Sequence, residues 1–142
     1  MNKARIIADT CIWIEYFRGS PGITEELKIL ITEDSLVLCG IVVYELFQGI
    51  KSPKERDMVR SDFEAIPYLE MDRPAWERAA HLSLSLRNKG ITVPPSDLIL
   101  SALALENECM IFTEDAHFEE IPGISLYSPK ASKIKSHPEK EV

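Results

Sequence analysis

Residues 5–19 read RIIADTCIWIEYFRG. The segment begins with a short apolar run over 5–8, which is typical of a buried strand. Asp9 ends this run, and a stretch of helical character over 11–18 follows until Gly19 closes it. A strand that passes directly into a helix is typical of a βαβ unit, so the segment predicts an α/β fold with a parallel sheet.

The same alternation continues along the 142 residues of the chain. Short apolar runs predict about five strands, at 5–8, 36–39, 68–71, 109–112 and 125–127, with the last at an edge of the sheet. Segments of helical period predict helices over 11–18, 24–32, 42–50, 53–65, 74–89 and 97–106. We therefore expect a central, mostly parallel sheet covered by helices.

Two of these helices carry apolar stripes that should face the core. The stripes are formed by Leu27, Leu30 and Ile31 in the first helix and by Trp76, Ala79, Ala80 and Leu86 in the second. The cysteines are odd in number, lie in apolar stretches and show no Cys-x-x-Cys spacing. We interpret all three, Cys11, Cys39 and Cys109, as buried thiols rather than redox or zinc-binding groups.

The composition, 45% hydrophobic and 27% charged residues, is that of one globular domain. We expect this domain to span residues 1–128 and to be followed by a polar, mobile, lysine-bearing tail over 129–142. No apolar run approaches the roughly 18 residues that span a bilayer, and residues 6–14 lack the form of a signal peptide. We expect a cytoplasmic protein with no membrane segment.

The formal net charge of -7 argues against a protein that binds nucleic acid mainly through a broad basic face. Contacts to phosphates would have to come from local cations or from a metal ion. The candidate cations, which could equally be ordinary solvated charges, are Lys51, Lys54, Arg56, Arg87 and Lys89.

Acidic residues follow two of the predicted strands. Asp9 comes directly after the strand at 5–8, and Asp115 comes shortly after the strand at 109–112. In open parallel sheets, ligands bind at the edge where the carboxyl ends of the strands meet, so both acids are candidates for a site. Each could equally cap the helix or turn that follows it.

Two further acids belong to predicted helices. Glu45 lies in the first turn of the helix over 42–50, where the helix dipole alone would favour a negative charge. Asp97 opens a helix after two prolines that hold the chain extended. The helix that follows is apolar almost all round and should be buried, so its N-terminus would bring Asp97 to the sheet edge, although Ser96 or Asp97 could simply cap it.

Four carboxylates at one edge would repel one another and raise one another's pKa unless a cation lay between them. Hard oxygen ligands favour magnesium or manganese over zinc or copper. The sequence therefore predicts a site for one or two Mg²⁺ or Mn²⁺ ions, held by Asp9, Glu45, Asp97 and Asp115.

These acids lie in four short motifs: Ile7-Ala8-Asp9-Thr10, Val43-Tyr44-Glu45-Leu46, PSDLILSALA at 95–104 and IFTEDAHF at 111–118. In this order and approximate spacing, the motifs resemble the PIN domain and, more narrowly, the toxin subunits of VapBC toxin-antitoxin systems. The resemblance covers nearly the whole chain, from Arg5 to about Tyr127. It implies a three-layer α/β/α sandwich with a sheet of about five strands.

The resemblance also implies an endoribonuclease that hydrolyses RNA phosphodiester bonds with the four acids as catalytic and metal-binding residues. Asp9 would be the shared central ligand, Asp97 and Asp115 would flank it, and Glu45 would bind metal directly or through water. Supporting polar groups would be Thr113, Thr10 and Ser96. A cognate antitoxin and a homodimer are further implications of the resemblance.

Two positions in the last motif need separate interpretation. Residue 114 is often Asn or Arg in such proteins, whereas it is Glu114 here, and we do not expect it to be a ligand. His117 lies near the expected site and is a minor candidate for a general base.

Other classes of protein also place an Asp at the end of a strand. A phosphatase of the haloacid dehalogenase type needs a second Asp two residues later, where this chain has Cys11. A response-regulator receiver needs a phosphoacceptor Asp at the third strand and a Lys near the fifth, and neither is evident. The remaining alternative is a PIN-like protein-binding subunit with little or no nuclease turnover.

Overall fold

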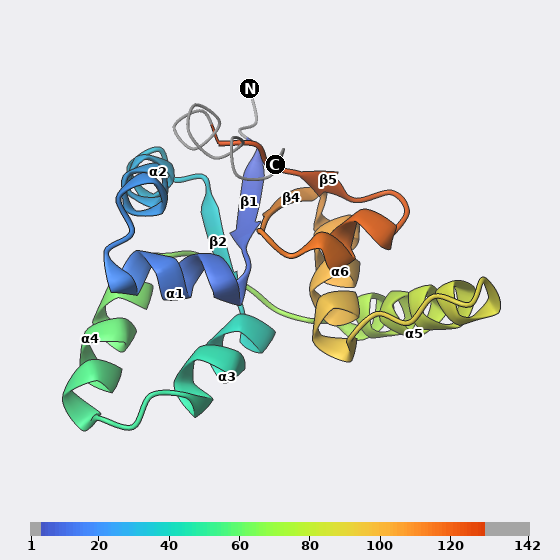
Figure 1. The fold of residues 1–142 in the computed structure, drawn as a ribbon, viewed down its shortest axis with the longest axis horizontal. Coiled ribbons are helices and arrows are strands. Elements are labelled where there is room, and N and C mark those ends of the chain that lie inside the picture. Colours follow the sequence, from blue (N-terminus) through green and yellow to red (C-terminus); the bar gives the residue numbers. More distant parts are fainter. Residues whose placement is uncertain (1–3, 130–142) are drawn as a thin grey trace, which may run out of the picture.

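The computed structural model describes residues 4–129, which form a five-stranded sheet with helices on both faces (Figure 1). The strands are β1 (Arg5–Ala8), β2 (Leu36–Cys39), β3 (Tyr68–Leu69), β4 (Cys109–Phe112) and β5 (Ser125–Leu126). Their order is β3-β2-β1-β4-β5, and every neighbouring pair is parallel. The predicted sheet is confirmed, although both edge strands are shorter than expected.

Within residues 4–129, six α-helices and one short 3-10 helix connect the strands. They are α1 (Thr10–Arg18), α2 (Pro21–Thr32), α3 (Gly40–Gln48), α4 (Pro53–Phe63), α5 (Arg73–Asn88), α6 (Pro95–Asn107) and η1 (Ala116–Glu120). Crossovers between parallel strands are right-handed, which places α1 to α4 on one face of the sheet and α5 and α6 on the other. The α/β/α sandwich is therefore confirmed, whereas η1 was not predicted.

The order of the strands creates a crevice at one end of the sheet. From β1 the chain continues to β2 and β3 on one side, whereas β4 and β5 lie on the other side of β1. The connections that leave β1 and β4 therefore diverge to opposite faces, and the carboxyl ends of these two strands border a topological switch point. Asp9 directly follows β1 and Thr113 directly follows β4, so both lie at this point.

Three helices begin two or three residues earlier than predicted. α2 starts at Pro21 and α6 at Pro95, because proline fits the first position of a helix, where its missing N–H would have no partner. α3 starts at Gly40. As a result Asp97 is the third residue of α6 rather than its opening residue, and Glu45 lies in the second turn of α3 rather than the first.

The core is one cluster of buried apolar side chains on both sides of β1. The rings of Trp13 and Phe63 meet edge to face, 5.0 Å between centroids, and so join α1 to α4. The expected stripe on α2 is confirmed for Leu27 and Leu30, which are buried, with Ile31 half-buried.

The predicted stripe on α5 is wrong in part. Trp76 is 52% exposed and Ala80 is exposed. The buried side of α5 is rotated by one residue and consists of Ala75, Ala79, Leu82 and Leu86. α5 packs mainly on α6, and the small alanines allow the two helices to approach closely.

Cys39 and Cys109 are buried as expected, but Cys11 is only half-buried, because it faces the crevice rather than the core. No helix within residues 4–129 is long and apolar enough to cross a membrane. The predicted tail lies outside the described residues from position 130 onward.

Candidate metal centre

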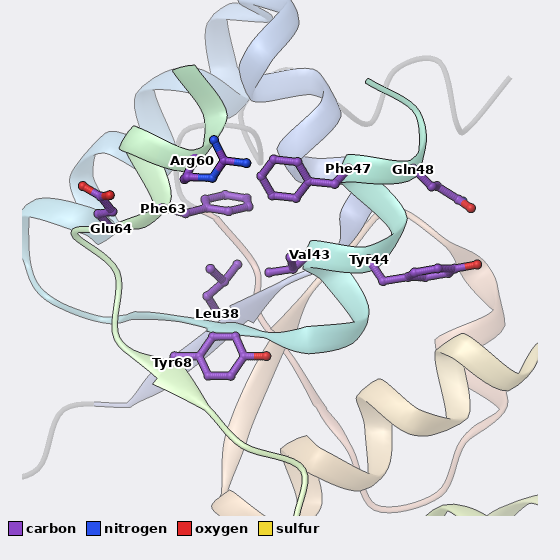
Figure 2. A pocket seen from close by; sticks show the side chains of 9 residues that line it. All are labelled: Leu38, Val43, Tyr44, Phe47, Gln48, Arg60, Phe63, Glu64 and Tyr68. Atoms are coloured by element: carbon purple, nitrogen blue, oxygen red, sulfur yellow. The ribbon is translucent and has the colours of Figure 1, made fainter. Parts of the chain in front are cut away.

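Several cavities border α3, and two of them differ clearly in chemistry. The larger of these two, of about 720 Å³, is bordered by α3, α4, β2 and β3 (Figure 2). Its lining is mainly apolar and aromatic, with Arg60 lying 5.8 Å from the centre of the Phe47 ring. It contains one carboxylate, that of Glu64, so it lacks the grouped acids expected of a metal site.

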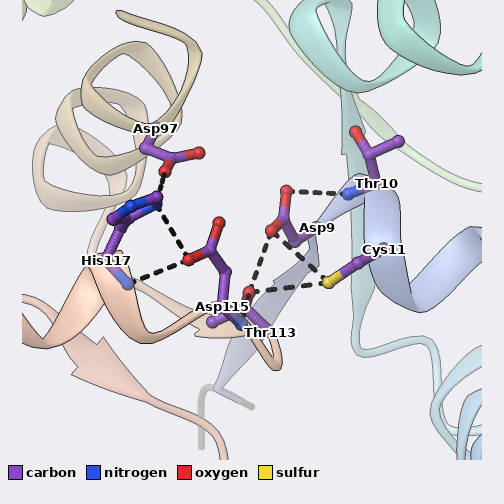
Figure 3. A network of polar contacts seen from close by, with 7 residues as sticks. All are labelled: Asp9, Thr10, Cys11, Asp97, Thr113, Asp115 and His117. Carbon is purple, nitrogen blue, oxygen red and sulfur yellow. Dashed lines mark hydrogen bonds and ion pairs between the residues drawn. The ribbon is translucent and has the colours of Figure 1, made fainter. Parts of the chain in front are cut away.

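The second cavity, of about 450 Å³, lies at the switch point and brings together all four predicted acids. Its lining consists of Asp9, Thr10, Cys11, Ile14, Glu45, Gln48, Pro94, Ser96, Asp97, Asp115 and His117. The acids come from the end of β1, from α3, from the first turn of α6 and from the turn after β4. Figure 3 shows the Asp9, Asp97 and Asp115 carboxylates directed toward one space.

Asp9 is held rigidly at the junction of β1 and α1. It is the N-cap of α1, and its Oδ1 accepts a hydrogen bond of 2.7 Å from the Thr10 backbone N–H. Its Oδ2 accepts a hydrogen bond of 2.9 Å from the Thr113 hydroxyl. The capping alternative is therefore correct for Asp9, but capping uses one oxygen and leaves the residue on the cavity wall.

Thr113 connects the two strand-end acids. Its hydroxyl donates to Asp9 and also accepts a hydrogen bond of 3.0 Å from the backbone N–H of Asp115. The Thr113 side chain therefore holds both the Asp9 carboxylate and the backbone of Asp115. These contacts agree with the prediction that Thr113 supports the acids of the site. The thiol of Cys11 lies 3.7 Å from the Thr113 Oγ1 and 3.6 Å from the Asp9 Oδ2.

Asp97 is the least satisfied of the four acids. The residue is 8% exposed, and its Oδ2 is buried without accepting any hydrogen bond. The N-cap position of α6 is occupied by Pro94, and no side chain caps this helix. Capping by Ser96 or Asp97 is therefore ruled out, and this structure gives Asp97 no capping role that would explain its burial.

Asp115 and His117 form a compact turn. Asp115 is the N-cap of η1, and its Oδ1 accepts a hydrogen bond of 2.9 Å from the His117 backbone N–H. The same oxygen lies 3.0 Å from His117 Nδ1, which is also 3.4 Å from the Asp97 Oδ2. The imidazole thus lies between two carboxylates, a contact that was not predicted from the sequence.

Glu45 is joined to the site through Thr10. The Thr10 hydroxyl donates a hydrogen bond of 2.7 Å to the Glu45 Oε1, which ties α1 to α3 across the cavity. Because Glu45 lies beyond the first turn of α3, the dipole of that helix does not explain its position. Ser96 lines the cavity as well, and Glu114 is exposed to solvent outside it.

The electrostatics of the cavity favour a cation. Burial, together with the nearby charges of Asp115 and Asp9, raises the pKa of Asp97 from 3.8 to about 6. Burial also raises the pKa of Asp9, although the hydrogen bonds from Thr113 and Thr10 partly offset this. A divalent ion would remove this cost, and a set of carboxylate oxygens that includes one buried acceptor without a hydrogen bond fits a hard cation.

Two expectations about the surroundings of the acids change. Within residues 4–129, none of the five predicted phosphate-binding cations lines the cavity, and the guanidinium of Arg56 donates to the backbone oxygen of Ile50 at 3.0 Å. Cys11 does line the cavity, and burial raises its pKa to about 11, so it remains a neutral thiol at physiological pH. His117 was expected near the site and lines the cavity, whereas the side-chain direction that brings Cys11 there could not be read from residue spacing.

The PIN domain model matches residues 6–124. The chain belongs to the PIN domain family. A VapC ribonuclease of Mycobacterium bovis and ribonuclease VapC11 of Mycobacterium tuberculosis are each 27% identical to it over 125 residues, covering 84% of this chain and 93% of theirs.

Solved structures of VapBC and FitAcB share the fold of this chain. The DNA-bound VapBC of Salmonella typhimurium matches with a TM-score of 0.76 at 22% identity, covering 88% of this chain and 98% of that one. FitAcB of Neisseria gonorrhoeae matches with a TM-score of 0.72 at 23% identity, covering 87% and 97%. The expected membership of the PIN family is confirmed.

Proposed function

We propose that this PIN domain protein is the toxin of a VapBC-type toxin-antitoxin pair, a metal-dependent endoribonuclease that hydrolyses RNA phosphodiester bonds in the cytoplasm. The observation that carries the proposal is the cavity in which Asp9, Glu45, Asp97 and Asp115 meet, with the Asp97 Oδ2 buried and without a hydrogen bond. The VapC ribonucleases similar to this chain over most of its length support the same reaction.

The positions of the acids support a role for each. Asp9 would be the central ligand, and its carboxylate is fixed by Thr10 at one oxygen and by Thr113 at the other. Asp97 and Asp115 would complete the site for Mg²⁺ or Mn²⁺, in one or two copies, and Glu45 would act from the α3 side. A bound divalent ion lowers the pKa of an attacking water and stabilises the leaving oxygen.

Thr113, Thr10 and Ser96 have supporting roles in this proposal. The hydroxyls of Thr113 and Thr10 hold the Asp9 and Glu45 carboxylates in place, as their hydrogen bonds of 2.9 and 2.7 Å indicate. Ser96, on the cavity wall beside Asp97, would contact substrate or metal-bound water. A further cavity, lined in part by Arg18, adjoins the acidic cavity and shares Ile14 and Glu45 with it. The bound RNA strand would extend from the acidic cavity into this adjoining one.

The proposal includes two protein partners. Solved structures with this fold include VapBC of Salmonella typhimurium and VapBC2 of Rickettsia felis, which supports an antitoxin as the partner of this chain. We also propose that the toxin forms a homodimer, and that residues 1–128 form the nuclease domain, with the rest of the chain as a tail.

The alternative of a binding subunit without turnover is not favoured, because all four acids are present in one cavity.

Cleavage of labelled single-stranded RNA by the purified toxin, freed of antitoxin, tests the proposal. We expect cleavage that requires Mg²⁺ or Mn²⁺, stops with EDTA and is lost in Asp97→Asn. Asp62→Asn, which changes an exposed acid outside the cavity, should cleave as the wild type does. Equal cleavage by the wild type and Asp97→Asn would reveal a contaminating nuclease, and failure to cleave any RNA with metal bound would reject the enzyme.

A further inference from the structure

The imidazole of His117 shares its surroundings with two of the proposed metal ligands. Its Nδ1 lies 3.0 Å from the Asp115 Oδ1 and 3.4 Å from the Asp97 Oδ2. In the described part of the chain, Asp97, Asp115 and His117 form the group of metal-ligating side chains whose donor atoms all lie within 4.8 Å of one another. The three donor atoms thus lie close enough together to bind one ion.

The spacing of these atoms matches neighbouring ligands around one ion. Ligands at about 2.1 Å in octahedral geometry lie about 3 Å from their neighbours. The backbone of η1 holds the imidazole near this position, because the His117 N–H donates to Asp115 Oδ1 at 2.9 Å. The third donor, Asp97 Oδ2, is buried and accepts no hydrogen bond, and His117 Nδ1 lies 3.4 Å from it.

We propose that His117 Nδ1 is a metal ligand, together with Asp97 and Asp115, and that it gives the site a preference for later first-row ions such as Co²⁺ over Mg²⁺. Imidazole nitrogen suits these ions, whereas Mg²⁺ prefers oxygen alone. The inference rests on the proposed function in that it concerns the same metal site. It adds a nitrogen donor to a site that was expected to contain only oxygen donors.

The position of His117 has a second interpretation that predicts the opposite effect. A protonated imidazole between two carboxylates could take the place of the metal, so that it competes with the ion. Its removal would then strengthen metal binding, whereas removal of a ligand weakens it. The side chain is 52% exposed, so its replacement should not disturb the core.

Binding of Co²⁺ and Mg²⁺ to the full, metal-free chain distinguishes a ligand role of His117 from a competing role. Titration calorimetry measures the affinities, and the visible spectrum of bound Co²⁺ reports its ligands. His117→Gln should weaken Co²⁺ binding roughly tenfold or more, and Mg²⁺ binding by less than about threefold. It should also change the Co²⁺ spectrum, which reports the loss of a nitrogen donor. The matched control is His81→Gln, an exposed histidine on α5 outside the cavity, and it should behave as the wild type.

Unchanged Co²⁺ affinity and spectrum in His117→Gln would overturn the proposal, and tighter binding of both ions would overturn it in favour of a competing cation. Neither readout depends on RNA cleavage. If the wild type cleaves no RNA but its Co²⁺ binding depends on His117, the nuclease function fails and the ligand assignment stands. If RNA is cleaved but Co²⁺ binding does not depend on His117, only the ligand assignment fails.

Discussion

Among single residues, Thr113 has the most connected position in the site, because its hydroxyl serves both strand-end acids. It donates to the Asp9 carboxylate and accepts from the Asp115 backbone. A buried carboxylate that loses such a donor is left with an unpaired oxygen, which costs about 1 to 3 kcal/mol. Loss of the Thr113 hydroxyl would therefore change both the orientation of the Asp9 carboxylate and the position of Asp115.

Thr113→Val should therefore reduce stability by about 1 to 3 kcal/mol and weaken Mg²⁺ binding roughly tenfold. Thr113→Ser, which keeps the hydroxyl, should retain most of both. Urea denaturation and titration calorimetry measure the two effects. Mg²⁺ affinity that is the same in the Val and Ser variants would show that the hydroxyl does not support the site.

Asp97 gives the metal-free protein a defined pH dependence. The folded pKa is raised to about 6 from the unfolded value of 3.8, so the folded state takes up a proton in a pH range where the unfolded chain does not. The free energy of unfolding must then increase as the pH falls from above 6 toward 4, and the destabilising charge is fully present above pH 6.

Asp97→Asn should raise the stability of the metal-free protein by on the order of 2 kcal/mol at about pH 7.5 and flatten its dependence on pH. Urea denaturation across this range, in the presence of EDTA, gives the difference between the variant and the wild type. Asp9 shifts the wild type in the same direction, so only the difference is diagnostic. A variant that is less stable than the wild type above pH 6 would contradict the assigned environment of Asp97.

The four acids could be predicted from the sequence because strand ends and helix starts converge at one edge of a parallel sheet. Asp9 and Asp115 could be assigned to the site from their places after β1 and β4 alone. The contacts of Cys11 and His117 could not be predicted, because they depend on the direction of side chains in a tight turn. The hydrophobic pattern of the sequence predicts strands and helices but not where the side chains of a turn point.

At the scale of elements, the ends of the helices hold the site together. α1 is capped by Asp9 at its N-terminus and by Gly19 at its C-terminus. The φ of Gly19, 81°, lies in the left-handed region, and its backbone N–H bonds to carbonyls of the last turn. The C-cap of α3 is Gly49, whose φ of -95° any residue can adopt. A side chain at Gly19 would meet no neighbouring atom within 4 Å, so only backbone strain opposes it.

Gly19→Ala should therefore destabilise the protein by about 1 kcal/mol, whereas Gly49→Ala should change stability by less than about 0.5 kcal/mol. Thermal and urea denaturation compare the two. Neither substitution touches the cavity, so metal affinity should be unchanged in both. Equal effects on stability would contradict the left-handed conformation assigned to Gly19.

The alternation of strands and helices was predictable, because each apolar run is bounded by a polar or turn residue. The starts of α2 and α6 differ from the prediction, because Pro21 and Pro95 form the first helical positions, as Pro53 does in α4. The buried side of α5 was also missed at Trp76. A large aromatic suggests core, but α6 approaches α5 along its small residues instead.

At the scale of the whole molecule, the strand order decides where the chemistry lies. β1 and β4 are parallel, but the chain continues from β1 to β2 on one side and from β4 to β5 on the other. This reversal of the strand order opens the crevice, where acids from both sides of the sheet meet. The sequence shows which segments are strands but does not fix the order in which they pair. The resemblance to the PIN domain predicted the sandwich but not this order, which comes from the structure.

A molecule with grouped buried carboxylates should be stabilised by its metal. A ligand that binds only the folded state at 100 times its Kd adds about 2.7 kcal/mol to the free energy of unfolding. We expect Mg²⁺ or Mn²⁺ to raise the melting temperature of the wild type, measured by calorimetry. Asp97→Asn should lose most of this increase, and Asp62→Asn should keep it. Equal increases in both variants would indicate binding elsewhere.

The most direct test of the metal centre is a crystal structure of the protein grown with Mn²⁺, with the anomalous signal used to locate the ion. We predict at least one Mn²⁺ in the cavity of about 450 Å³, coordinated by Asp9, Asp97 or Asp115. A saturated crystal with no ion among these carboxylates, from protein that still cleaves RNA, would contradict the assignment of the site.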